Sequence, residues 1–175
     1  MKSTGAPKIE TLTDLFAAAY RIEADAVERY RLLADQMEVF NNPELVTVFR
    51  DLAKAEGYHA EEIKRQAGDI DVVAHAERIG KKWRGDSPEE VDMSTAHYMM
   101  TPWHALQMAL AGEKRALAFF TRIAETAKDP KVKEMADEFV EEEAEHVNLV
   151  HRLLRKYPPP ASTWSRDSDP PISQE

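Results

Sequence analysis

The 175-residue sequence contains no cysteine, which excludes disulfide bonds, zinc–cysteine sites, iron–sulfur clusters and thiol catalysis together. Glycine is scarce, with only 6 residues, and 43% of the chain is hydrophobic, a composition that suits helices. No apolar run approaches the roughly 18 residues that indicate a membrane-spanning helix, and residues 1–10 lack the apolar segment of a signal peptide. We therefore expect a cytoplasmic protein without a membrane partner.

Positive charge is also in short supply. The chain has 23 Lys and Arg residues against 32 Asp and Glu, a formal charge of -9. Nucleic acids bind proteins that present clustered cations, so we expect no nucleic-acid partner. The length is typical of one domain with a substantial core. Because cysteine is absent, any bound metal must be held by Glu, Asp and His side chains.

The first part of the chain is predicted to form a helical hairpin. Residues 1–10 have no periodic pattern and are expected to be flexible. Thr11 or Thr13 can cap a first helix that runs to about Phe40, with apolar residues repeating at helical spacing. The turn at residues 41–43, Asn-Asn-Pro, is short enough to join antiparallel neighbours. A second helix follows it.

The second part of the chain repeats this plan. A third helix is predicted to start near Pro102, and a fourth follows the turn at Asp129-Pro130. Residues 66–101 have weak periodicity and read as a long crossover that contains short helical pieces at most. Residues 157–175 are rich in Pro, Ser and Asp and are expected to be extended or disordered. Residues 11–156 thus form an all-α antiparallel four-helix bundle.

Two pairs of residues stand out within this bundle. Glu56 and His59 lie three positions apart, as do Glu143 and His146, so on a helix each pair projects from one face. Both pairs fall on the apolar stripe of their helix. A carboxylate and an imidazole at this spacing can bind one metal ion, and bundles that bind two iron ions use two such helices plus one Glu from each remaining helix.

The two further carboxylates are Glu23 and Glu113. Each interrupts the apolar stripe of its helix, and each precedes an aromatic residue by seven positions. Four buried glutamates would be costly as bare anions, because an unpaired buried charge costs several kcal/mol. Lys and Arg are absent from the four apolar stripes, so we expect no internal salt bridge. Two divalent cations would balance the charge.

The predicted site therefore holds two metal ions per chain. Oxygen and imidazole donors suit Fe and Mn, and Zn less selectively, and iron is the expected metal. We expect Glu23 and Glu113 as terminal ligands and the other two glutamates as bridges, with one histidine completing each ion. Tyr30 is a candidate hydrogen-bond donor or one-electron relay. The six predicted ligands are Glu23, Glu56, His59, Glu113, Glu143 and His146.

These residues resemble the rubrerythrin-like di-iron domain of the ferritin-like superfamily. The resemblance covers about residues 10–156 and includes the phrases Glu-Lys-Arg-Ala-Leu-Ala-Phe-Phe from Glu113 and Glu-Glu-Glu-Ala-Glu-His from Glu141. It implies a ferritin-like bundle with a long crossover between its second and third helices, a di-iron centre and chemistry with oxygen or peroxide. Unlike rubrerythrins proper, this chain has no cysteine for a rubredoxin domain.

We accordingly expect a di-iron peroxidase or ferroxidase that oxidises Fe(II) with hydrogen peroxide or dioxygen and depends on an external electron donor. A homodimer is expected from the resemblance and from Trp and Met residues in the crossover. A di-iron hydroxylase of an organic substrate is an alternative. A second alternative is a non-enzymatic helical scaffold whose C-terminal tail docks a partner.

Overall fold

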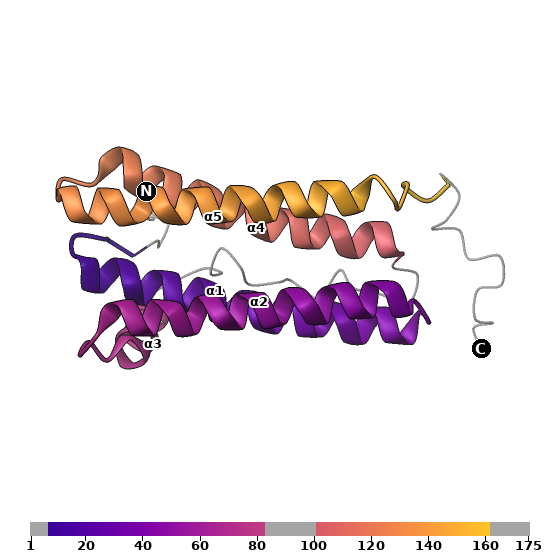
Figure 1. Cartoon of the computed structure of the whole chain (residues 1–175), viewed down its shortest axis with the longest axis horizontal. Helices are drawn as coiled ribbons and strands as arrows, with labels where there is room; N and C mark the ends of the chain where they lie inside the picture. Colours follow the sequence, from indigo (N-terminus) through magenta and orange to yellow (C-terminus); the bar gives the residue numbers. More distant parts are fainter. Residues whose placement is uncertain (1–6, 83–100, 162–175) are drawn as a thin grey trace, which may run out of the picture.

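A computed structural model describes residues 7–82 and 101–161, and these residues form five α-helices. Two antiparallel hairpins lie side by side along the long axis of the molecule (Figure 1). This arrangement confirms the predicted all-α, ferritin-like bundle. The helices are α1 (Leu12–Val39), α2 (Pro43–Ala67), α3 (Val72–Lys82), α4 (Pro102–Thr126) and α5 (Pro130–Leu154).

Side-chain caps fix where the long helices begin. The Thr11 hydroxyl accepts a hydrogen bond from the Asp14 backbone N–H at 3.1 Å, and the Asp14 carboxylate accepts one from the Thr11 N–H at 3.0 Å. This reciprocal pair satisfies two N–H groups that the first turn of α1 leaves without a helical partner. Asn42 and Asp129 accept similar bonds at the starts of α2 and α5, where proline is the first helical residue.

Replacing Thr11 with alanine is expected to lower the free energy of unfolding by about 1 kcal/mol, because it removes the capping hydroxyl. Urea denaturation followed by circular dichroism measures the change. Thr13→Ala, two residues later inside the helix, is the matched control and should cost clearly less. Equal losses from the two variants would show that the cap does not stabilise α1.

A layer of four glutamates divides the core of the bundle in two. One apolar cluster contains Ile22, Ile63, Ala116 and Phe139, and the other contains Tyr30, Leu52, Leu110 and Val150. Along every long helix the buried glutamate falls between a residue of the first cluster and a residue of the second. The apolar residues therefore hold the four carboxyl groups at one level of the bundle, with close-packed layers on both sides.

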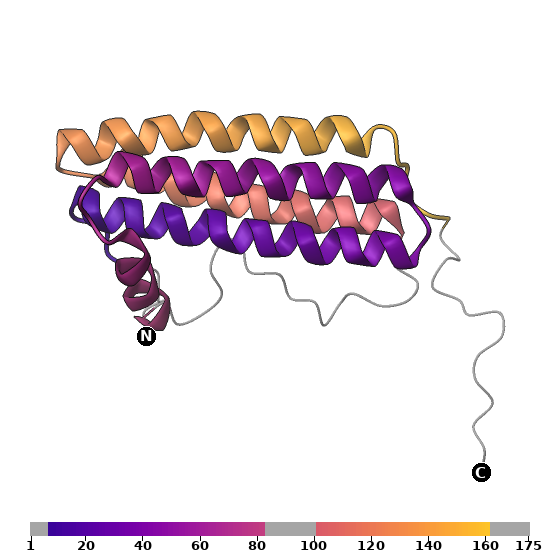
Figure 2. The same ribbon diagram turned by 60° about the horizontal axis from the view of Figure 1, so that its bottom comes forward.

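Helix α3 lies within the segment predicted as the crossover. It packs against α1 and points away from the axis of the bundle (Figure 2). Val72 and Ala76 are buried in this contact, and Gly80 lies so close to α1 that a β-carbon there would come within 2.9 Å of the Arg21 side chain. The prediction of short helical pieces is confirmed here. Residues 83–100, whose Trp and Met residues supported the expectation of a dimer, lie outside the described residues.

None of the helices in residues 7–82 and 101–161 is both long enough and apolar enough to cross a membrane.

Candidate metal centre

The four predicted glutamates are all buried, with 1–4% of their surface exposed. Each comes from a different long helix: Glu23 from α1, Glu56 from α2, Glu113 from α4 and Glu143 from α5. Glutamate is almost never fully buried in proteins unless it has a partner. Four in one layer therefore indicate a site with a chemical purpose.

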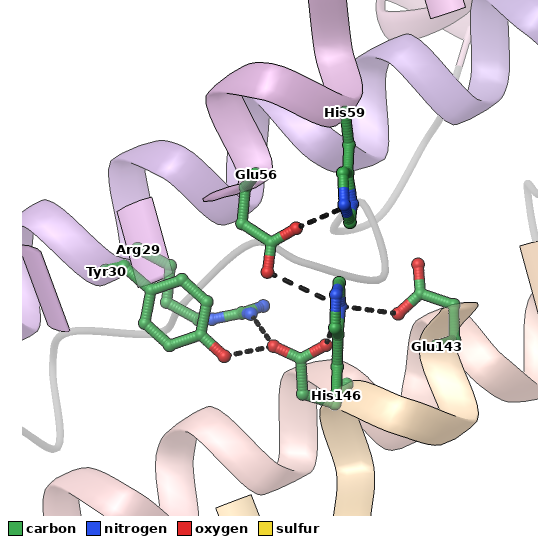
Figure 3. Close-up of polar contacts among 7 residues, drawn as sticks. Arg29, Tyr30, Glu56, His59, Glu143 and His146 are labelled. Carbon is green, nitrogen blue, oxygen red and sulfur yellow. Dashed lines mark hydrogen bonds and ion pairs between the residues drawn. The ribbon is translucent and has the colours of Figure 1, made fainter. Parts of the chain in front are cut away.

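The two histidines join this layer from α2 and α5. Their rings stack nearly parallel, with centroids 5.2 Å apart and an angle of 8° between the planes (Figure 3). The Nδ1 atom of His59 lies 3.6 Å from Glu56 Oε2. The Nδ1 atom of His146 lies 3.4 Å from Glu56 Oε1, 3.4 Å from Glu113 Oε2 and 3.8 Å from Glu143 Oε2. One imidazole nitrogen thus faces three carboxylates.

Among the described residues, two overlapping groups bring potential ligand atoms within 4.8 Å of one another. One consists of Glu56, His59 and His146, and the other of Glu113, Glu143 and His146. Glu23 is in neither group but is buried in the same layer, on α1, which packs against α2. Five of the six predicted ligands therefore fall within these groups, and the sixth is adjacent to them.

Arg29 corrects one prediction from the sequence. We expected no internal salt bridge, but the Arg29 guanidinium is buried within the bundle, and its Nη2 atom donates a hydrogen bond to Glu113 Oε1 at 2.5 Å. The side chains of Arg29 and Glu113 are only 0% and 2% exposed. Among the residues that the structure describes, Arg29 is the only basic one that is buried. Its charge neutralises one carboxylate of the glutamate layer.

A helical pattern in the sequence could have identified Arg29. It follows Ile22 by seven residues and Ala26 by three, and it precedes Leu33 by four. These spacings place all four side chains on one face of a helix. All three apolar neighbours are buried in the structure. The buried face of α1 is thus wider than the stripe through Glu23 and Tyr30, and Arg29 lies within it.

Tyr30 meets the same carboxylate as Arg29. Its hydroxyl donates a hydrogen bond to Glu113 Oε1 (Figure 3). Its ring stacks on Phe49, with centroids 6.0 Å apart. Burial raises the pKa of Tyr30 well above 10, and the negative charge of Glu113 raises it further. The phenol therefore keeps its proton and acts as a donor to Glu113.

Burial dominates the electrostatics of the carboxyl groups. Loss of water raises the pKa of Glu23, Glu56 and Glu143 above the ordinary value of 4.5, and repulsion from neighbouring carboxylates adds to the shift. Glu113 behaves differently, because hydrogen bonding to His146 and the charge of Arg29 outweigh burial and lower its pKa. The layer therefore contains one stabilised anion and three carboxyl groups that lack adequate positive charge.

The residues present fit a pair of metal ions. Both oxygens of Glu56 and the Nδ1 atom of His59 are buried and accept or donate no hydrogen bond. Such unsatisfied polar atoms are rare and costly inside proteins. Cations bound between these oxygen and nitrogen atoms would satisfy them and would also lower the repulsion that raises the carboxyl pKa values.

The metal-free protein should lose stability as pH rises above the ordinary glutamate pKa of 4.5. Carboxyl groups with a raised pKa in the folded state bind more protons when folded than when unfolded, so the free energy of unfolding falls with pH. Each such group contributes up to about 1.4 kcal/mol per pH unit within its window. Burial lowers the pKa of His59 from 6.5, so this histidine binds more protons in the unfolded state. Its contribution to the free energy of unfolding therefore rises with pH, but only below about pH 6.5.

Urea denaturation in the presence of a chelator, at pH 5.5 and pH 7.5, tests this dependence. Glu23→Gln should flatten the slope, because it replaces the carboxyl group whose pKa is raised by burial and by three other glutamates. A stability that rises with pH over this interval would contradict the assignment of raised pKa values.

Together, the fold and the layer of carboxylates and imidazoles define a ferritin-like helical bundle with a candidate di-metal site. The family model for rubrerythrin matches residues 14–98 and 104–168. The chain belongs to the rubrerythrin family. A crystal structure of an uncharacterized conserved protein from Magnetospirillum magnetotacticum MS-1 is similar to it, with a TM-score of 0.70 and 34% identity over 86% of this chain and 98% of that one. A search of curated proteins finds no match.

Proposed function

We propose that the protein is a di-iron oxidoreductase that oxidises Fe(II) while reducing hydrogen peroxide or dioxygen. The observation that supports this most strongly is the layer of four buried glutamates and two stacked histidines contributed by four helices, five of which form two overlapping groups of potential ligands. Membership of the rubrerythrin family supports the same assignment.

In this proposal the six side chains hold two ions. Glu23, Glu56 and His59 would surround one position, and Glu113, Glu143 and His146 the other. Two Fe(II) ions, losing one electron each, would supply the two electrons that convert one hydrogen peroxide and two protons into two water molecules. An external donor would then return the electrons.

The chain's own residues control access and protons at this site. The His59 side chain is 32% exposed and that of His146 is 15% exposed, whereas the glutamate side chains are nearly inaccessible. A small oxidant would therefore approach from the imidazole side, between α2 and α5. On the opposite side, Tyr30 keeps a proton on its hydroxyl and orients the Glu113 carboxylate.

Anaerobic titration of metal-free protein with Fe(II) tests the proposal, followed by mixing with peroxide and, separately, with dioxygen. We expect about two ions per chain and rapid oxidation, recorded by near-ultraviolet absorption, with the faster oxidant distinguishing a peroxidase from an oxidase. Failure to bind Fe(II), or binding without oxidation by either reagent, would overturn the proposal.

A hydroxylase would need an apolar channel that leads an organic substrate to the metals. A cleft of about 850 Å³ does occur, but it lies at one end of the bundle, between residues 7–10 and the turn from α4 to α5. None of the six candidate ligands lines this cleft, and Lys8, Arg122 and Lys128 make it partly basic. It therefore gives no support to a hydroxylase.

A further inference from the structure

We infer that Arg29 and Tyr30 make the two metal positions unequal in affinity. A divalent cation first fills the position between Glu23, Glu56 and His59, called here the Glu23 position. It fills the position between Glu113, Glu143 and His146, the Glu113 position, second and more weakly. This inference rests on the proposed di-metal site and concerns the order in which it fills. Arg29 acts through Glu113 and is a positioning residue.

The contacts of Glu113 restrict what it can offer a metal. Its Oε1 atom accepts hydrogen bonds from both Arg29 Nη2 and the Tyr30 hydroxyl. A carboxylate oxygen has two lone-pair directions, and both are used here. Only Oε2 remains for an ion, and this atom faces His146 at 3.4 Å. Glu113 is therefore oriented as a ligand with a single available oxygen.

The carboxylate groups near the other position are less restricted. Both oxygens of Glu56 are buried without a hydrogen bond, and Glu56 lies next to His59. Glu23 is buried on α1, the helix that packs against α2, which carries Glu56 and His59. A cation here gains contacts with oxygen atoms that accept no hydrogen bond. His146 Nδ1 lies 3.4 Å from both Glu56 Oε1 and Glu113 Oε2, so it favours neither position.

The charge of Arg29 acts in the same direction. Fully ionised, the four glutamates carry four negative charges and Arg29 carries one positive charge. The first divalent ion therefore leaves one net negative charge, whereas the second leaves one net positive charge. Arg29 lies against Glu113, so its repulsion falls mainly on an ion bound there, within a buried environment that screens charge poorly.

The consequence concerns the proposed reaction. A chain with one ion can supply only one electron from Fe(II), whereas reduction of peroxide to water takes two. Occupancy of the weaker Glu113 position would therefore limit the rate of oxidation, and the ion at that position would be the one that exchanges with solution.

Calorimetric titration of the full-length, metal-free protein with Co(II), an ion that binds similar oxygen and nitrogen ligands, tests this inference. We expect two ions in two resolved steps, separated by at least about tenfold in affinity, the scale on which groups behind the ligands change metal affinity. Arg29→Met should narrow the separation, because it removes the positive charge, and Arg29→Lys should preserve it. Glu23→Gln should remove the tighter step and leave the weaker one.

The outcomes separate this inference from the proposed function. Two ions bound with indistinguishable affinities, or loss of the weaker step in Glu23→Gln, would overturn the inference that the two positions differ in affinity in this order. The proposed di-metal site would remain. Failure to bind Co(II) would overturn both. Because Glu23→Gln retains Arg29, it tests the order of filling even where Arg29→Met proves too unstable to titrate.

Discussion

Replacing Arg29 with methionine is expected to lower the free energy of unfolding of the metal-free protein by about 3–5 kcal/mol at neutral pH. The guanidinium is completely buried, and its hydrogen bond to Glu113 spans 84 residues and joins α1 to α4. Without it, Glu113 keeps its contacts with Tyr30 and His146 but loses the Arg29 charge, so it either remains a buried anion with less compensation or takes up a proton that it does not bind in the native protein. Either outcome destabilises the folded state.

Urea denaturation followed by circular dichroism measures this loss, and two further variants show its origin. Arg50→Met removes a similar contact on the surface, where Arg50 and Glu38 lie 3.1 Å apart with more than half of each side chain exposed. Such pairs contribute at most about 1 kcal/mol. The double variant Arg29→Met with Glu113→Gln should recover much of the loss, because the stranded charge is gone. Equal effects at Arg29 and Arg50 would contradict the buried pair.

The layer of carboxylates was predictable because it breaks a strong pattern. Glu23 and Glu113 interrupt apolar stripes, and the spacing of Glu56 with His59 and of Glu143 with His146 is a local property of a helix. The long helices also carry their own start signals, such as Thr11 before α1 and Asn42 before α2. Helical spacing and helix start signals are therefore enough to predict the bundle and the level along it at which the buried polar residues meet.

Contacts between distant segments were harder to predict. The pairing of Arg29 with Glu113 depends on which flank of α1 turns towards α4, and the period of the apolar stripe does not specify that flank. Helix α3 is short, with 11 residues, and isolated helices of that length are marginal in water. Its stability depends on packing against α1, and its own sequence does not specify which helix it packs against.

The six candidate ligands and the two residues that contact Glu113, Arg29 and Tyr30, have different effects on the site. The six candidate ligands determine whether a metal can bind, whereas Arg29 and Tyr30 determine how one of those ligands is oriented and charged. The sequence pattern thus predicts the chemistry of the site, and the tertiary contacts determine how symmetric it is. Hydrogen bonding to His146, the charge of Arg29 and the hydrogen bond from Tyr30 together lower the pKa of Glu113, whereas burial raises the pKa of Glu143.

Replacing Glu56 and Glu143 together with glutamine is expected to abolish stabilisation by metal. Glu56 belongs to one ligand group and Glu143 to the other, so the double variant weakens both positions. In the wild-type protein, free Co(II) at a thousand times its dissociation constant should add about 4 kcal/mol per ion to the free energy of unfolding. The variant should gain almost nothing.

The same variant should be at least as stable as the wild-type protein when metal is absent. Burial and neighbouring carboxylates raise the pKa of both glutamates, which means that their charged forms are unfavourable in the folded state. Glutamine has nearly the same shape and no charge, so it removes that penalty without leaving a cavity. Denaturation with and without Co(II) separates the two effects, and Glu141→Gln with Glu145→Gln, two exposed positions on α5, serves as the control. Stabilisation by Co(II) that survives in the buried pair but not in the exposed pair would place the metal on the surface of α5 and refute the buried site.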